Sequence, residues 1–411
     1  MKSVVCFLLG CLLAVSVHSQ VLNLGSLDTV DFSEDTKTEL KRQLKDARVV
    51  VLGEQTHGIA EEYLGFSRMV KFLHEEMGFQ VLIQEYCFFS THEVNQQLEA
   101  NESAQALRQT MYWPQGKSLE YNALFDYLDA QRKLGKPIQV EGFDSRLTQR
   151  KTVKQWFDQL LSHFLSPASS SEFKAMARKA IHQVIEREYT DTLTTSNEKE
   201  RAYELLDQMI EYYQSLPTHG RDVQRLKSLK AFAQNAWNPM GYSDQDLRRY
   251  HYREHQMAEN LLWLIEEVYQ EERIIVHMHN GHAAKNIESF QAYTRDSSGL
   301  KNVTVGSLLN ERLGAACFIV GTTAYAGNHC RWDFKPIVIP PAHPTSLEAE
   351  LHRTNLTYCW INLEEHKEPF YLFFNEFNNW VPSSEIKAPY GQMFDALIFY
   401  DRVNPPQSLE K

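Results

Sequence analysis

The chain of 411 residues is 43% hydrophobic and 12% aromatic, a globular composition that excludes a fibrous or low-complexity protein. Its formal net charge of −11 argues against a polyanionic partner, so we expect no nucleic acid to bind. Of the six cysteines four lie after residue 19, and four in this length are too sparse for a disulfide scaffold. The chain is long enough for one large α/β domain or two ordinary ones.

Residues 1–19 have the features of a secretory signal peptide. Lys2 gives a positive start, residues 4–15 are apolar, and small residues up to Ser19 precede the expected cleavage point. A Leu-Leu-Gly-Cys sequence ending at Cys11 loosely resembles a bacterial lipobox, but the chain stays apolar after it, so cleavage near Ser19 is preferred over lipid anchoring. No later stretch predicts a membrane span. We therefore expect export, to a secreted or periplasmic location.

The chain alternates between short apolar runs and helical patterns. The apolar runs predict strands at residues 47–53, 79–86, 137–144, 273–280, 317–327 and 394–403. The first four are continuously apolar before their last residues, which is typical of strands buried on both faces of a parallel or mixed sheet. Apolar residues at helical spacing predict an amphipathic helix over residues 58–77.

The segment of residues 150–270 differs from the rest of the chain, because it is rich in charged residues, has few strand-like runs and shows a helical pattern of apolar residues. We expect an α/β fold with a central, mostly parallel sheet flanked by helices. Its first part would be residues 20–149 and its second part residues 271–411. Residues 150–270 would form a large helical insertion or cap between them.

Four of the cysteines follow the expected signal peptide. Cys87 and Cys317 lie in apolar runs and are interpreted as packed thiols. Cys330 and Cys359 are a candidate disulfide pair, which the sequence leaves open. It also leaves the oligomeric state open.

Polar side chains stand where four of the predicted strands end. They are Glu54 and His57, then Glu85, then Asp144, and finally His279, Asn280 and His282. The carboxyl ends of parallel strands meet at one edge of a sheet, so these side chains should converge on one cleft. Each motif alone has a plainer interpretation: Glu54 or Thr56 caps the next helix, and the later histidines are structural. The i, i+3 spacing of both pairs also permits metal ligation, although no HExxH motif occurs.

A helix predicted over residues 247–268 carries an arginine on its apolar stripe. At about 100° per residue, Arg253 lies close to Met257 and Leu264. A buried arginine needs an anionic partner or a polar cavity, so we expect Arg253 to face the cleft rather than to extend to solvent at the end of the stripe. Arg68 lies opposite the apolar stripe of its own helix and faces either the cleft or solvent.

These residues resemble the erythromycin esterase family. The matching pieces occur in the family's order and are LGEQTHG (52–58), LHEEMGF (73–79), the strand with Glu85, MYWPQGKSLEYNALFDYLDAQRK (111–133), VEGFDSR (140–146), YREHQMAENLLWL (252–264), IIVHMHNGH (274–282) and FDALIFYD (394–401). The resemblance implies an α/β core with a helical portion and hydrolysis of a cyclic ester by water. By motif it carries over Glu54 and His57, Glu85, Arg253, and His279 and His282. Gln55, Gly281 and Glu254 depart from the family's usual residues, which leaves the substrate open.

Our hypothesis is hydrolysis of a small-molecule ester or macrolactone. His57, oriented by Glu54 or Glu85, would act as general base on water, since the ordinary pKa of histidine suits that role. His279 or His282, with Arg253, would polarise the carbonyl. Arg68, Asp144 and Asn280 are the expected substrate-binding residues. No G-x-S-x-G elbow supplies a nucleophile.

Two alternatives stay open. The same Glu and His cluster would hold a divalent metal in a metal-dependent hydrolase, although the preferred mechanism needs no cofactor. In a non-enzymatic protein the histidines would bind haem, a metal or a small anion instead. Clearance of an external antibiotic is a role that export and the family resemblance would allow.

Overall fold

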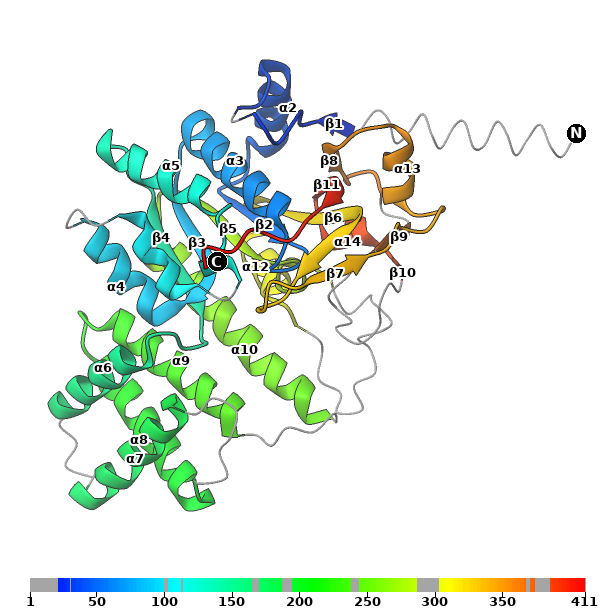
Figure 1. Cartoon of the computed structure of the whole chain (residues 1–411). Helices are drawn as coiled ribbons and strands as arrows, with labels where there is room; N and C mark the ends of the chain where they lie inside the picture. The colour runs from blue at the N-terminus through cyan, green and yellow to red at the C-terminus, as the bar shows by residue number, and fades with distance from the viewer. Residues whose placement is uncertain are drawn as a thin grey trace, which may run out of the picture.

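The computed structural model describes residues 21–29, 31–99, 103–111, 114–164, 170–186, 194–237, 244–286, 303–366, 370–373 and 385–410 (Figure 1). The expected signal peptide at residues 1–19, including Cys11, lies outside the described residues. Among the helices described, none is both long and apolar enough to cross a membrane.

A nine-stranded sheet forms the centre of the described structure, in the order β1-β8-β11-β6-β2-β5-β3-β4, with β7 paired to β6. The strands are β1 (Val21–Asn23), β2 (Val49–Glu54), β3 (Phe79–Cys87), β4 (Gln139–Asp144), β5 (Arg273–His279), β6 (Cys317–Cys330), β7 (Pro336–Ile339), β8 (Tyr358–Asn362) and β11 (Ala396–Val403). From β11 to β4 all neighbours are parallel, whereas β1, β7 and β8 pair antiparallel. The predicted α/β fold with a mostly parallel sheet is confirmed. β9 (Phe370–Phe373) and β10 (Glu385–Ala388) form a separate antiparallel pair.

Helices cover both faces of this sheet (Figure 1). They are α2 (Glu34–Leu44), α3 (Ala60–Met77), α4 (Phe88–Glu99), η1 (Ala104–Thr110), η2 (Gln115–Lys117), α5 (Asn122–Lys133), α6 (Arg150–His163), α7 (Ser171–Glu186), α8 (Ser196–Gln214), α9 (Gly220–Trp237), α10 (Asp244–Trp263), η3 (Leu264–Val268), α11 (Asn280–Ala283), α12 (Val305–Leu313), η5 (Gly314–Ala316), α13 (Leu347–Arg353) and α14 (Tyr390–Met393). Helices α2, α3 and α5 share one hydrophobic core with the sheet, and α10 and α12 share a second core on the other face. Every residue of β2 is buried, as a strand between two helical layers requires.

Helices α6 to α9 lie between β4 and β5 in the chain and have a third hydrophobic core of their own. Phe157, Ile181 and Leu206 are fully buried within it. Helix α10 runs from this group back to the sheet, where Met257 and Leu261 are fully buried in the sheet's second core. The segment of residues 150–270 thus contains a helical group and one helix that packs on the sheet.

The four cysteines of the described residues are all free and buried. The candidate bridge between Cys330 and Cys359 is wrong because the two lie on strands separated by β11. Phe399 of β11 pairs with Cys359 on one side and Thr323 on the other, and Cys330 lies further along β6. Two strand spacings alone are about 9–10 Å, beyond the reach of a disulfide.

Candidate active site

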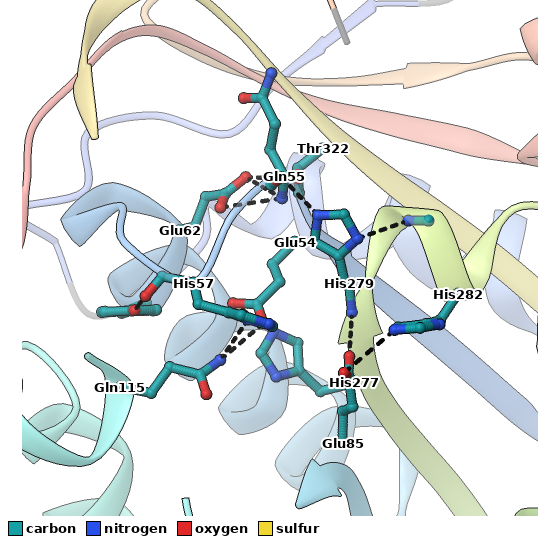
Figure 2. A network of polar contacts seen from close by, with 12 residues as sticks. Glu54, Gln55, His57, Glu62, Glu85, Gln115, His277, His279, His282 and Thr322 are labelled. Atoms are coloured by element: carbon teal, nitrogen blue, oxygen red, sulfur yellow. Dashed lines mark hydrogen bonds and ion pairs between the residues drawn. The ribbon is translucent and has the colours of Figure 1, made fainter. Parts of the chain in front are cut away.

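The carboxyl ends of four adjacent parallel strands bring the site together. Glu54 ends β2, His279 ends β5, Glu85 lies near the end of β3, and Asp144 ends β4. The sheet order β2-β5-β3-β4 makes these strands neighbours, although the four residues are far apart in the chain. All four side chains are at most 9% exposed. The strand-end pattern in the sequence thus corresponds to one polar cluster, of which Figure 2 shows Glu54, Glu85 and His279.

Glu54 and His57 form a close pair at the end of β2. Oε1 of Glu54 lies 2.6 Å from Nδ1 of His57 and also accepts from Nε2 of Gln115 at 2.7 Å. A carboxylate only accepts, so the shared proton sits on Nδ1 of His57, and in the neutral ring Nε2 then carries the lone pair. The His57 side chain is 31% exposed whereas Glu54 is buried. An oriented imidazole with a buried carboxylate behind it is the geometry of a general base.

The helix-capping interpretation of Glu54 and Thr56 is wrong. Helix α3 begins after Ile59, which provides no side-chain cap. The backbone N–H of Gln55 instead donates to both carboxylate oxygens of Glu62, at 2.9 and 3.1 Å. Glu62 therefore holds the turn after β2, and the carboxylate of Glu54 faces His57.

Arg253 of α10 has anionic partners at the sheet edge, as its place on the apolar stripe indicated. Nε and Nη2 donate to the two oxygens of Asp144 at 3.0 and 2.5 Å. Nη2 also donates to Oε1 of Glu85 at 2.9 Å. Burial would raise the pKa of Asp144, but Arg253 outweighs it and holds that pKa below its ordinary value. Asp144 is thus engaged in orienting the arginine.

His282 lies between two carboxylates. Its Nδ1 contacts Glu254, and its Nε2 lies 3.3 Å from Oε1 of Glu85. Burial alone would lower the pKa of His282, but Glu254 and Glu85 outweigh it and raise that pKa to about 10. Burial would likewise raise the pKa of Glu85, whereas His282 and Arg253 hold it well below its ordinary value. At neutral pH, His282 and Arg253 are therefore neighbouring buried cations that both contact Glu85, with Nη1 of Arg253 3.2 Å from Nε2 of His282.

His279 lies between the Glu54–His57 pair and the cluster around Glu85. Its ring centre lies 5.7 Å from that of His57 and 6.1 Å from that of His282. Its Nε2 lies 2.8 Å from the carbonyl oxygen of Gln55, and its Nδ1 lies 3.0 Å from the N–H of Gly281. A carbonyl only accepts and an N–H only donates, so His279 is the neutral Nε2–H tautomer. The backbone N–H of His279 donates to Oε2 of Glu85 at 2.9 Å, and this bond connects β5 to β3.

Two of the expected substrate-binding residues are engaged elsewhere. Arg68 is buried, donates to the carbonyls of Ser26 and Asp31, and stacks over Phe32 at 4.1 Å. It faces neither the cleft nor solvent, because the segment after β1 covers this side of α3. Asn280 is fully buried, and its amide group is bound to the backbone of Thr322. We therefore assign neither residue to substrate binding.

The structure adds site residues that the sequence did not indicate. They are Glu62, Gln115, Glu254, His277 and Thr322. Nε2 of His277 lies 3.9 Å from Oε2 of Glu54, and its ring stacks on Phe66 at 3.8 Å. Burial lowers the pKa of His277, so this ring is neutral beneath Glu54. The signal for it was present, because a strand places His277 and His279, two residues apart, on one face.

The described residues contain no group of three or more His, Cys, Asp or Glu side chains arranged to hold a metal ion. The carboxylates that could serve as ligands have other partners. Glu85 and Asp144 face Arg253, and Glu54 faces His57 and Gln115.

Fold and site together define an α/β protein with a buried cluster of Glu, His and Arg at the carboxyl edge of a parallel sheet. The sequence model described as erythromycin esterase matches residues 74–403, and the chain belongs to the erythromycin esterase family. That match includes Glu85, Arg253, His279 and His282, and it begins after Glu54 and His57.

Two curated proteins are similar over most of this chain. The putative hydrolase YbfO of Bacillus subtilis is 23% identical over 420 residues, covering 92% of this chain and 89% of that protein. Erythromycin esterase type II of Escherichia coli is 22% identical over 332 residues, covering 74% of this chain and 75% of that protein.

Solved structures share the fold. A Bacillus cereus protein superposes with a TM-score of 0.73 at 20% identity, covering 96% of this chain and 98% of that one. A mutant of the erythromycin esterase EreC in its open conformation superposes with a TM-score of 0.65 at 14% identity, covering 94% and 98%. A protein described as a succinoglycan biosynthesis protein superposes with a TM-score of 0.69 at 17% identity, covering 97% of this chain and 98% of that one.

Proposed function

We propose that this protein is an ester hydrolase that cleaves a small-molecule ester or lactone with water activated by His57. The observation that carries the proposal is the 2.6 Å contact between buried Glu54 and half-buried His57. Membership of the erythromycin esterase family and similarity to a protein named a hydrolase support the reaction class. The low identity leaves the choice of ester to experiment.

The proposed proton transfers need only water, His57 and Glu54. Nε2 of His57 takes a proton from water as the water oxygen attacks the ester carbonyl carbon. Glu54 stabilises the imidazolium that forms, which is the role of an acid behind a histidine base. The C–O bond to the alcohol then breaks, and His57 returns the proton to the departing alkoxide. The products are a carboxylic acid and an alcohol.

We assign the electrostatic part of the reaction to Arg253 and His282. Both carry positive charge at neutral pH and lie at the same edge of the sheet, so they would favour the oxyanion of the tetrahedral intermediate. We assign His279 a positioning role between the turns after β2 and β5, because backbone atoms of Gln55 and Gly281 bind its two ring nitrogens. By the sequence pattern of residues 1–19 we further propose that the protein acts after export.

The test is an activity screen of the mature protein against macrolides and a panel of generic esters. We expect hydrolysis of at least one ester by the wild type and loss of it in His57→Ala, with the fold intact by circular dichroism. His163→Ala is the matched control, because His163 is an exposed histidine on α6. Near-normal turnover by His57→Ala would contradict the assignment of the base.

A further inference from the structure

Thr322 lies on β6, outside the motifs of the family resemblance, yet it contacts the turn that carries His279 and His282 and, through Glu62 of α3, is linked to the turn that carries His57 (Figure 2). One turn follows β2 and carries His57, and the other follows β5 and carries His279 and His282. In the sheet, β2 lies between β6 and β5. Thr322 is 4% exposed, so its contacts are made away from solvent.

The first contact is with the turn after β5. Nδ2 of Asn280 donates to the carbonyl of Thr322 at 2.8 Å, and the N–H of Thr322 donates to Oδ1 of Asn280 at 3.1 Å. Asn280 reaches across β2 to make this pair of bonds, and Gly53 gives it the space. A Cβ at Gly53 would lie 2.2 Å from Oδ1 of Asn280.

The second contact is with Glu62 of α3, which holds the turn after β2. Oγ1 of Thr322 donates to Oε1 of Glu62 at 2.5 Å, and Glu62 accepts the N–H of Gln55. The carbonyl of Gln55 in turn accepts from Nε2 of His279. Since His279 and Asn280 are adjacent in the chain, these bonds close a ring that returns to Thr322.

The hydroxyl of Thr322 matters because of where Glu62 lies. Glu62 is 3% exposed, and burial together with the nearby Glu54 raises its pKa to about 8. A buried carboxyl that loses a hydrogen-bond partner is costly, so it would move or draw in water. Either response displaces Gln55, and with it the carbonyl that fixes the His279 ring.

We propose that Thr322 is a positioning residue of the active site, which fixes the turn carrying His57 and the turn carrying His279 and His282 relative to each other. Its effect on turnover rests on the hydrolysis proposed above. Its effect on the His279 ring does not.

The test compares Thr322→Val with Thr323→Val in the mature protein. Valine removes the hydroxyl but keeps the branched shape and the backbone bonds to Asn280. Thr323 is an equally buried neighbour, and its hydroxyl donates to Oε1 of Glu348 at 2.7 Å, so it loses the same kind of bond away from the histidines. We expect kcat on the best ester to fall about 10- to 100-fold in Thr322→Val, with KM changed much less. Thr323→Val should stay close to the wild type, and Thr322→Ser should restore kcat.

A second readout does not need a substrate. In protein labelled with 15N-histidine, we expect the His279 signals of an Nε2–H tautomer, assigned by their loss in His279→Asn. These signals should shift or broaden in Thr322→Val and stay unchanged in Thr323→Val. If Thr322→Val does not fold, Glu62→Gln takes its place, because it keeps an acceptor for Gln55 but changes the contact with Thr322.

The outcomes separate the two proposals. If the wild type cleaves no ester, the proposed function fails, and the His279 signals alone decide the role of Thr322. If Thr322→Val, or its substitute, matches Thr323→Val in kcat and in the His279 signals, the positioning role is overturned. An Nδ1–H tautomer of His279 in the wild type would also overturn it.

Discussion

Arg253 donates to both carboxylate oxygens of Asp144, which joins α10 to the end of β4. The same guanidinium reaches Glu85 at the end of β3. One guanidinium from a helix thus pairs with two buried carboxylates at the edge where four strands end. This contact connects the stability of the sheet edge to the charge of the candidate site.

Replacement of Arg253 by methionine should strongly destabilise the protein. It leaves Asp144 and Glu85 buried with one cation fewer, and loss of one partner of a buried ion pair costs about 3–5 kcal/mol. Urea unfolding of Arg253→Met measures this loss. The control is Arg312→Met, which breaks an ion pair with Glu266 at an arginine that is 63% exposed and should cost less than about 1 kcal/mol. Equal losses in the two variants would show that the Arg253 contact is not buried as described.

The charge on His282 should make its contribution to stability depend on pH. The folded pKa of about 10 exceeds the unfolded value of about 6.5. The contribution is then fully present below about pH 6.5 and is lost as pH rises through the folded pKa. The difference in free energy of unfolding between the wild type and His282→Gln should be a few kcal/mol at pH 6 and shrink toward pH 10. A difference for His282→Gln that stays constant over this pH range would refute the cationic state.

Gly53→Ala should destabilise the protein and lower its activity. The added Cβ would lie 2.2 Å from Oδ1 of Asn280 and 2.9 Å from the carbonyl oxygen of Val320. Overpacking of this kind costs about 1–3 kcal/mol and would push Asn280 away from Thr322. Gly220→Ala is the control, because its nearest atom lies 3.6 Å away. The prediction is checked by measuring thermal unfolding and turnover of the two variants. A Gly53→Ala protein as stable and active as Gly220→Ala would contradict the crossing of Asn280 over β2.

Chelation should leave hydrolysis unchanged. Arg253 and the protonated His282 both contact Glu85, so a divalent cation bound to Glu85 would lie beside two positive charges. We expect full turnover after dialysis against EDTA, with bound metal measured in the same preparation. Activity that is lost on chelation and restored by a divalent metal would favour the metal-dependent alternative.

The sequence was most informative where a local pattern has a direct structural meaning. Continuous apolar runs marked the buried strands, and polar residues at their ends marked the sheet edge where Glu54, Glu85 and Asp144 lie. The helical phase of Arg253 relative to its apolar stripe indicated a buried arginine, and the structure gives it two carboxylate partners.

The remaining features depend on contacts between segments far apart in the chain. Arg68 was misplaced because the segment containing Ser26 and Asp31 folds over α3, which no helical pattern shows. Thr322 sits in an apolar strand and gave no signal, since its partners come from α3 and from the turn after β5. The Cys330–Cys359 pairing failed because strand order, which separates them by β11, is not a property of either local sequence.

The central claim is that Glu54 and His57 act as one catalytic unit, and a double-mutant cycle of kcat/KM on the best ester tests it most directly. The four proteins are the wild type, Glu54→Gln, His57→Ala and the double variant. Because the carboxylate acts only through the imidazole, we expect the double variant to be no slower than His57→Ala. Losses from the two single substitutions that add fully in the double variant, or a His57→Ala protein with near-normal kcat/KM, would contradict the claim.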